Sequence, residues 1–219
     1  ALTALREAVE HAGLSEALLR KSGLVNGTTV GGMDQSELYY KSFLDGANLD
    51  FVKAFAAHDC GHGTERIADE LGIKGYLSTI STACSSSANS VMHAAKLIKS
   101  GMADIVIAGG TDALSLFTFN GFNTLKILDP SWCRPFDKDR KGLNLGEGAA
   151  YLVLESESAA SKRNAHVYAQ LTGYGNANDA YHQTASSIEG VGAGMAMTEA
   201  LRIAGLQAKD IDYINVHGT

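Results

Sequence analysis

Short apolar runs recur along the chain, and several of them alternate with segments of helical periodicity. Residues 104–108 (DIVIA) and 149–154 (AAYLVL) are apolar at successive positions rather than at alternate ones. A strand with this pattern is buried on both faces, so helices have to cover both sides of its sheet. The sequence therefore predicts an α/β fold with a covered sheet.

Other segments extend this alternation. Residues 85–100 read as a helix because Val91, Ala94, Ala95 and Ile98 share one face, and Gly101 follows its end. Residues 26–33 are predicted as a strand that runs into a turn at the paired glycines. Further strands are predicted at residues 76–81, 166–174 and 211–216, and further helices at 1–13, 64–71, 156–163 and 193–204. Residues 36–55 show no clean period.

The composition narrows the class of protein. A formal net charge of −6 argues against nucleic acid as a partner. No apolar run approaches the roughly 20 residues needed to cross a bilayer, and no signal-peptide pattern opens the chain. The cysteines, Cys60, Cys84 and Cys133, are scattered and odd in number, which does not suit a disulfide framework. We therefore expect a cytoplasmic protein without nucleic-acid or membrane partners.

Cys84 lies between a predicted strand and a predicted helix. Unpaired N–H groups and the helix dipole favour an anion at such a junction, here the thiolate that acts as a nucleophile. The same N–H groups could stabilise the oxyanion of a thioester under attack. Position alone leaves a second interpretation open, in which Cys84 is a small buried hydrophobic residue.

Five blocks, taken together, resemble one family. They are residues 82–90 (TACSSSANS), 103–112 (ADIVIAGGTD), 134–154 (RPFDKDRKGLNLGEGAAYLVL), 178–182 (NDAYH) and 212–219 (DYINVHGT). Their order and approximate spacing are similar to those of the β-ketoacyl-acyl-carrier-protein synthases of the thiolase superfamily. The resemblance runs from about the opening helix to the last residue.

This resemblance implies a thiolase-like layered α-β-α-β-α fold. Residues 1–160 would form most of its N-terminal half, without the first strand and helix, and residues 161–219 would begin the C-terminal half. We therefore expect the chain to be an incomplete fragment that does not catalyse condensation alone. The resemblance also makes Cys84 the acyl-accepting nucleophile, His217 one of two catalytic histidines, and Thr219 a contact to the phosphopantetheine arm.

Three further residues match family positions. Phe122 corresponds to a phenylalanine near the acyl pocket and the dimer interface, and Met33 lies near the position that limits acyl-chain length. A role in the core is an open alternative for each. Lys126 corresponds to a basic residue that contacts the acidic carrier protein. A basic cluster could extend that patch or simply be a solvated face; it comprises Arg134, Lys138, Arg140 and Lys141.

The reaction implied is a decarboxylative Claisen condensation of an acyl-enzyme with a malonyl thioester. No metal or nucleotide cofactor is expected, because the phosphopantetheine is carried by the acyl carrier protein. The expected partners are that carrier, acyl and malonyl thioesters, and a second copy in a homodimer. A thiolase acting on coenzyme A thioesters and a non-catalytic chain-length partner subunit remain alternatives, as do fatty-acid, polyketide and polyene pathways.

Three local patterns look like functional motifs but lack the required context. His58, Cys60 and His62 alternate as metal ligands would, yet adjacent glycines favour a turn and no fourth ligand is evident. A dinucleotide-binding loop follows a strand, whereas no strand is predicted before the glycines of residues 190–194. The serines of residues 85–87 lie in no G-x-S-x-G motif.

Overall fold

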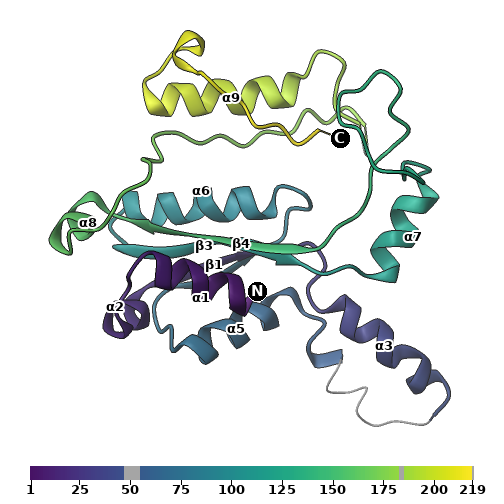
Figure 1. Cartoon of the computed structure of the whole chain (residues 1–219), viewed down its shortest axis with the longest axis horizontal. Coiled ribbons are helices and arrows are strands. Elements are labelled where there is room, and N and C mark those ends of the chain that lie inside the picture. The colour runs from purple at the N-terminus through teal and green to yellow at the C-terminus, as the bar shows by residue number, and fades with distance from the viewer. Residues whose placement is uncertain (47–54, 183–184, 219) are drawn as a thin grey trace. The chain divides into compact units, whose positions relative to one another are not determined.

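The structure is a computed structural model that describes residues 1–46, 55–182 and 185–218. It divides into two compact units, Ala1–Ala165 together with Gly218, and His166–His217. Figure 1 traces the chain from purple to yellow. None of the described helices is long and apolar enough to cross a membrane.

The first unit is built on a mixed sheet of β1 (Gly23–Gly27), β2 (Leu77–Ile80), β3 (Ile105–Asp112) and β4 (Gly148–Glu155). The strand order is β2-β1-β3-β4, with β1 parallel to both β2 and β3, and β4 antiparallel to β3. Parallel pairing brings the carboxyl ends of β1, β2 and β3 to one edge. The segments that follow these strands therefore meet at that edge.

The first unit's described helices are α1 (Leu2–His11), α2 (Glu16–Lys21), α3 (Met33–Leu44), α5 (Cys60–Leu71), α6 (Ser86–Lys99), α7 (Leu116–Thr124) and α8 (Glu157–Lys162). In Figure 1, α6 covers one face, and α1 and α5 cover the other. Serine hydroxyls at positions 15, 115 and 156 accept backbone N–H groups at the starts of α2, α7 and α8.

Successive strand residues supply two different cores. Leu24 and Ile107 pack with residues of α1 and α5, whereas Val25, Val106 and Ala108 pack with α6. Leu24, Val25, Val106 and Ile107 are all fully buried. The predicted covered sheet is thus confirmed, because neighbouring side chains of one strand point to opposite faces and both faces are packed.

A polar network crosses the α5 side of the sheet. The Tyr151 hydroxyl donates to Asn26 Oδ1 at 2.7 Å, and Asn26 Nδ2 donates to Thr64 Oγ1 at 3.2 Å. The Thr64 hydroxyl lies 2.6 Å from that of Thr79. Burial raises the pKa of the Tyr151 phenol above its ordinary value. The network joins β1, β2, β4 and α5, and both atoms of the buried Asn26 side-chain amide have partners.

The strand predicted to run into a turn over residues 26–33 lies earlier in the chain than expected. The observed β1 ends at Gly27, and Met33 begins α3. Beyond the strand, the side chain of Thr28 and the N–H groups of Thr29 and Val30 bond to the Asp112 carboxylate. The β-branched residues therefore form a loop fixed by a distant side chain, despite their preference for strands.

Other helix boundaries also differ from expectation. The helix α5 begins at Cys60, before the expected residue 64, because Asp59 Oδ1 accepts the Gly61 N–H at 2.7 Å and caps the first turn. Neither α3 nor α7 was predicted, since α3 lies partly in the stretch without a clean period and α7 contains Gly121. The part of residues 36–55 at 47–54 lies outside the described residues.

The second unit contains α9 (Val191–Ala204) and the 3-10 turn η1 (Ala208–Asp210). The strands predicted at residues 166–174 and 211–216 were wrong, since neither described segment forms one. An added Cβ at Gly173 would lie 2.1 Å from Ala200 O, and one at Gly175 would lie 2.0 Å from Ala196 O. The neighbour of this segment is therefore α9, which offers no ladder of backbone partners for a strand.

Candidate active site

Cys84 occupies the turn between β2 and α6. Its side chain is exposed, which contradicts the interpretation that it is a buried hydrophobic residue. The helix α6 begins two residues later, at Ser86. The dipole of a helix favours negative charge near its start, such as the oxyanion of a thioester under attack.

The residue before the cysteine has a constrained backbone. Ala83 has a φ of +51°, in the left-handed region, which costs a non-glycine residue about 1–2 kcal/mol. Its carbonyl oxygen accepts from Ser86 N at 3.0 Å, Ser86 Oγ at 2.6 Å and Thr29 Oγ1 at 3.1 Å. These contacts hold the turn in a conformation that the chain alone would rarely adopt.

The polar residues around Cys84 stabilise the same turn. Ser86 Oγ accepts Thr82 N at 2.9 Å, and Ser85 Oγ donates to Thr82 O at 2.8 Å. Asn89 Nδ2, one turn into α6, donates to Thr82 Oγ1 at 2.9 Å and Ser85 Oγ at 3.2 Å. Ser85, Ser86 and Asn89 are therefore structural parts of the site, a role that the sequence reasoning missed.

The helix that follows Cys84 starts almost on the sheet. An added Cβ at Gly27, the end of β1, would lie 2.7 Å from both Ser86 C and Ser87 N. At Gly110 on β3 it would lie 2.2 Å from Ser87 Oγ. At Gly27 only glycine lets the two backbones approach so closely, so β1 limits how near the start of α6, and the turn that carries Cys84, lies to the sheet.

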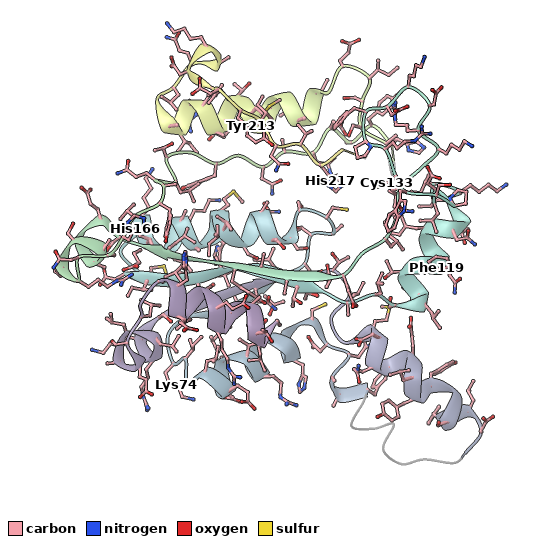
Figure 2. The ribbon with its side chains drawn as sticks, in the orientation of Figure 1. Lys74, Phe119, Cys133, His166, Tyr213 and His217 are labelled. Carbon is pink, nitrogen blue, oxygen red and sulfur yellow. The ribbon has the colours of Figure 1, made fainter. Side chains whose placement is uncertain are left out.

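His217 is exposed and is the last residue of the second unit, where Figure 2 labels it. Cys84 belongs to the first unit. Thr219, the expected contact to phosphopantetheine, lies outside the described residues.

The expected acyl-pocket residues lie on two helices that are tied together. Met33 begins α3 and Phe122 lies on α7, and both side chains are half-buried. Glu37 of α3 accepts Leu116 N at 2.8 Å and Phe117 N at 2.5 Å, and so caps α7. The structure thus brings together the elements that carry Met33 and Phe122.

Lys126 follows α7 in a turn with a φ of +56° and is exposed. Within the basic cluster, Arg134 lies 3.9 Å from the Asp137 carboxylate, and Arg140 donates to Asp137 O at 2.9 Å. The two arginines therefore shape their own loop, whereas Lys138 and Lys141 are exposed.

The histidine–cysteine pattern of residues 58–62 and the glycines of residues 190–194 take part in local structure. His58 Nδ1 lies 2.9 Å from Ser36 Oγ, and Cys60 is the first residue of α5. Among the described residues, no group of three or more His, Cys, Asp or Glu side chains could hold a metal ion. Gly190, with a φ of +61°, is the N-cap of α9.

The NDAYH block closes the loop that enters α9. Asp179 Oδ2 accepts Ser187 N at 2.9 Å, and this bond holds the pKa of the Asp179 carboxyl below its ordinary value. Gly192 lies close by, since a Cβ there would be 3.0 Å from Asp179 N. Of the glycines in residues 190–194, Gly192 therefore serves the packing of this loop.

Family models match almost the whole chain. The model described as "Beta-ketoacyl synthase, N-terminal domain" matches residues 1–160, and "Beta-ketoacyl synthase, C-terminal domain" matches residues 168–219. The chain belongs to the β-ketoacyl synthase family. Its thiolase-like fold, expected from the sequence, is shared with solved ketosynthases.

The relatives of this β-ketoacyl synthase chain are longer than it is. It is 37% identical over 230 residues to 3-oxoacyl-[acyl-carrier-protein] synthase 2 of Staphylococcus aureus, covering 100% of this chain and 57% of that protein. The ishigamide ketosynthase/chain length factor structure matches with a TM-score of 0.92 and 35% identity, covering 100% and 55%. The chain spans about half the length of the relatives that it matches.

A third match comes from type II polyketide biosynthesis. In that structure, a type II PKS acyl-carrier protein is in complex with its ketosynthase, AntDE. The match has a TM-score of 0.89 and 28% identity, and it covers 99% of this chain and 57% of the other.

Proposed function

We propose that the protein containing this chain is a β-ketoacyl-acyl-carrier-protein synthase of fatty-acid or polyketide biosynthesis, with Cys84 as its nucleophile. One observation carries the proposal: in a chain of this family, the cysteine is exposed on a constrained turn at the start of α6. Such an unfavourable backbone is typical of functional sites, where the surrounding contacts hold it in place. His217, within the matched C-terminal domain, is the proposed second catalytic residue.

The proposed reaction has two stages. The Cys84 thiolate attacks the carbonyl carbon of an acyl-carrier-protein thioester, the carrier's thiolate leaves, and the acyl group stays on Sγ. A malonyl thioester then loses carbon dioxide, and its enolate carbon attacks the acyl-enzyme carbonyl. This step releases the Cys84 thiolate and a β-ketoacyl product two carbons longer. His217 stabilises negative charge on the thioester oxygen as it develops.

The chemistry needs no redox or metal step, so we propose that no cofactor is required beyond the phosphopantetheine of the carrier. Met33 and Phe122 are proposed to line the acyl pocket, which is supported by the joined positions of α3 and α7. Thr219 is proposed to contact the pantetheine arm.

An acidic acyl carrier protein is the proposed macromolecular partner. The complex of the related ketosynthase AntDE with a carrier protein supports this partner. On this chain, the exposed Lys126, Lys138 and Lys141 offer positive charge to such a surface. The arginines of the same loop contribute less to binding in this proposal, because they already bond within the loop.

A second copy of the chain is the proposed subunit partner. The strand β2 ends the described sheet at one edge, and such an edge presents unpaired backbone groups that can bond to another strand. The ishigamide ketosynthase/chain length factor structure supports a heterodimer as the alternative. A cytoplasmic location is also proposed, in keeping with the free cysteines Cys60, Cys84 and Cys133.

Intact-mass spectrometry of the full-length protein tests the proposal. Incubation with an acyl carrier protein loaded with a medium-length acyl chain should add the mass of one acyl group, and Cys84→Ala should abolish the adduct. Added malonyl-carrier protein should then discharge it. An adduct formed from acyl-coenzyme A but not from the carrier would identify a thiolase. No adduct from either donor would identify a non-catalytic subunit.

A further inference from the structure

Asp112 ends β3 with its carboxylate turned to the loop after β1. Its Oδ1 accepts three hydrogen bonds, from Thr28 Oγ1 at 2.7 Å, Thr29 N at 2.8 Å and Val30 N at 3.3 Å. Thr28 is buried, and its hydroxyl also accepts Gly31 N at 3.1 Å. One carboxylate oxygen therefore fixes the path of a loop that lies more than 80 positions away in the sequence.

The same loop reaches the turn that carries the nucleophile. Thr29 donates its hydroxyl to the carbonyl oxygen of Ala83 at 3.1 Å. Ala83 is the left-handed residue directly before Cys84. Ser86 holds this carbonyl from the α6 side, and Thr29 is the residue that holds it from the β1 side.

These contacts make a continuous path from Asp112 to Cys84. The carboxylate fixes the backbone of Thr29, which places the Thr29 hydroxyl on Ala83 O, and Ala83 determines where the next residue projects. A nucleophile has to be held within about 0.5 Å of its productive geometry, and its supporting contacts provide that precision. Thr29 is exposed, so its hydrogen bond serves little purpose in packing a core.

We propose that Asp112 and Thr29 are positioning residues for the acylation of Cys84. Asp112 holds the loop of residues 28–31, and Thr29 transmits that constraint to the Ala83 carbonyl. This inference rests on the proposed role of Cys84 as the nucleophile.

A pair of substitutions at Thr29 tests the transmitting bond in the full-length protein. Thr29→Val keeps the shape of the side chain but removes the donor, and Thr29→Ser keeps the donor. The measurement is the single-turnover rate of Cys84 acylation by acyl-carrier protein, followed by intact mass over a range of carrier concentrations. We expect Thr29→Val to lower the maximal rate by about 5- to 10-fold with half-saturation unchanged, since one hydrogen bond is lost. Thr29→Ser should stay within about 2-fold of the parent.

Substitutions on β3 test the anchor. Asp112→Ala should slow acylation by about 10- to 100-fold. Because both residues act through the same contact, the double variant Asp112→Ala/Thr29→Val should lose less rate than the two single losses multiplied together. Asp104→Asn is the matched control, because Asp104 precedes the same strand and bonds to Ser156 at 3.1 Å, at the opposite end from the turn. It should acylate at the parent's rate.

The outcomes separate this inference from the proposed function. A parent protein that takes no acyl group would refute the proposed function itself. A parent that is acylated, together with a Thr29→Val variant of equal rate, would overturn the positioning role. Equal slowing by Thr29→Val and Thr29→Ser would also overturn it, since the hydroxyl would then be irrelevant. If Asp112→Ala does not fold, the Thr29 pair decides alone.

Discussion

The close approach of α6 to the sheet predicts a large effect of one methyl group at Gly27. A Cβ added there would lie 2.7 Å from Ser86 C, 2.7 Å from Ser87 N and 2.8 Å from Ser86 O. Carbon atoms in contact prefer about 3.5–4.0 Å, so α6 and β1 would have to separate by close to 1 Å. All three atoms belong to the backbone and cannot rotate away.

The expected consequences of Gly27→Ala concern both stability and rate. Overpacking of this kind costs about 1–3 kcal/mol in the free energy of unfolding. A displacement of about 1 Å at a reacting group can lower the rate about 100-fold. We therefore expect the variant to be less stable in urea and to acylate Cys84 much more slowly in the single-turnover assay.

Gly63→Ala in α5 is the control for this experiment. Gly63 is helical, and no atom lies within 4 Å of an added Cβ. Alanine there should stabilise the protein by about 0.5–1 kcal/mol through helix propensity and leave acylation unchanged. A Gly27→Ala protein with the parent's urea midpoint and acylation rate would show that the reasoning from this contact is wrong.

Further predictions concern three other contacts. Tyr151→Phe leaves the buried Asn26 Oδ1 without its donor and should cost about 1–3 kcal/mol in urea unfolding. Burial raises the pKa of Tyr151, so the contribution of this phenol to stability is full below about pH 10 and falls at higher pH. Unfolding free energies measured from about pH 8 to about pH 11 should show this decline, and the decline should be smaller in Tyr151→Phe. Glu37→Ala uncaps α7 and should cost about 0.5–2 kcal/mol, with faster amide exchange in the first turn of α7; unchanged exchange would contradict the cap. Arg163→Lys loses a two-pronged pairing with Glu155 and should lower the melting temperature, whereas Arg202→Lys, at an exposed pair, should not.

The site was only partly predictable from the sequence. The strand–turn–helix pattern placed Cys84 correctly, because local periodicity and the small residues around it are visible in a short window. The roles of Asp112, Thr29 and Ser86 were missed. Asp112 gave a weak signal as an acidic residue after a buried apolar strand, but nothing nearby in sequence indicates what it binds.

The errors in the predicted strands have a common origin. Residues 28–30 and 166–174 have the composition of strands. Residues 28–30 are instead held by Asp112, and residues 166–174 pack on α9 through Gly173. A strand requires a backbone partner in register, and side-chain preference alone does not supply one. The helices α3 and α7 were missed for a different reason. Helix α3 lies partly in a stretch without a clean period, and the start of α7 is capped by Glu37, which lies 79 positions away in the sequence.

By itself the sequence determined the class of fold, the covered sheet and the position of Cys84 at a helix start, because each follows from patterns within about 20 consecutive residues. Only the tertiary structure decided how Cys84 is held. The bond from Thr29 to Ala83 joins residues 54 positions apart, and the bond from Thr28 to Asp112 joins residues 84 apart. Such contacts depend on the order and register of the strands, which parallel pairing sets only once the whole sheet has formed.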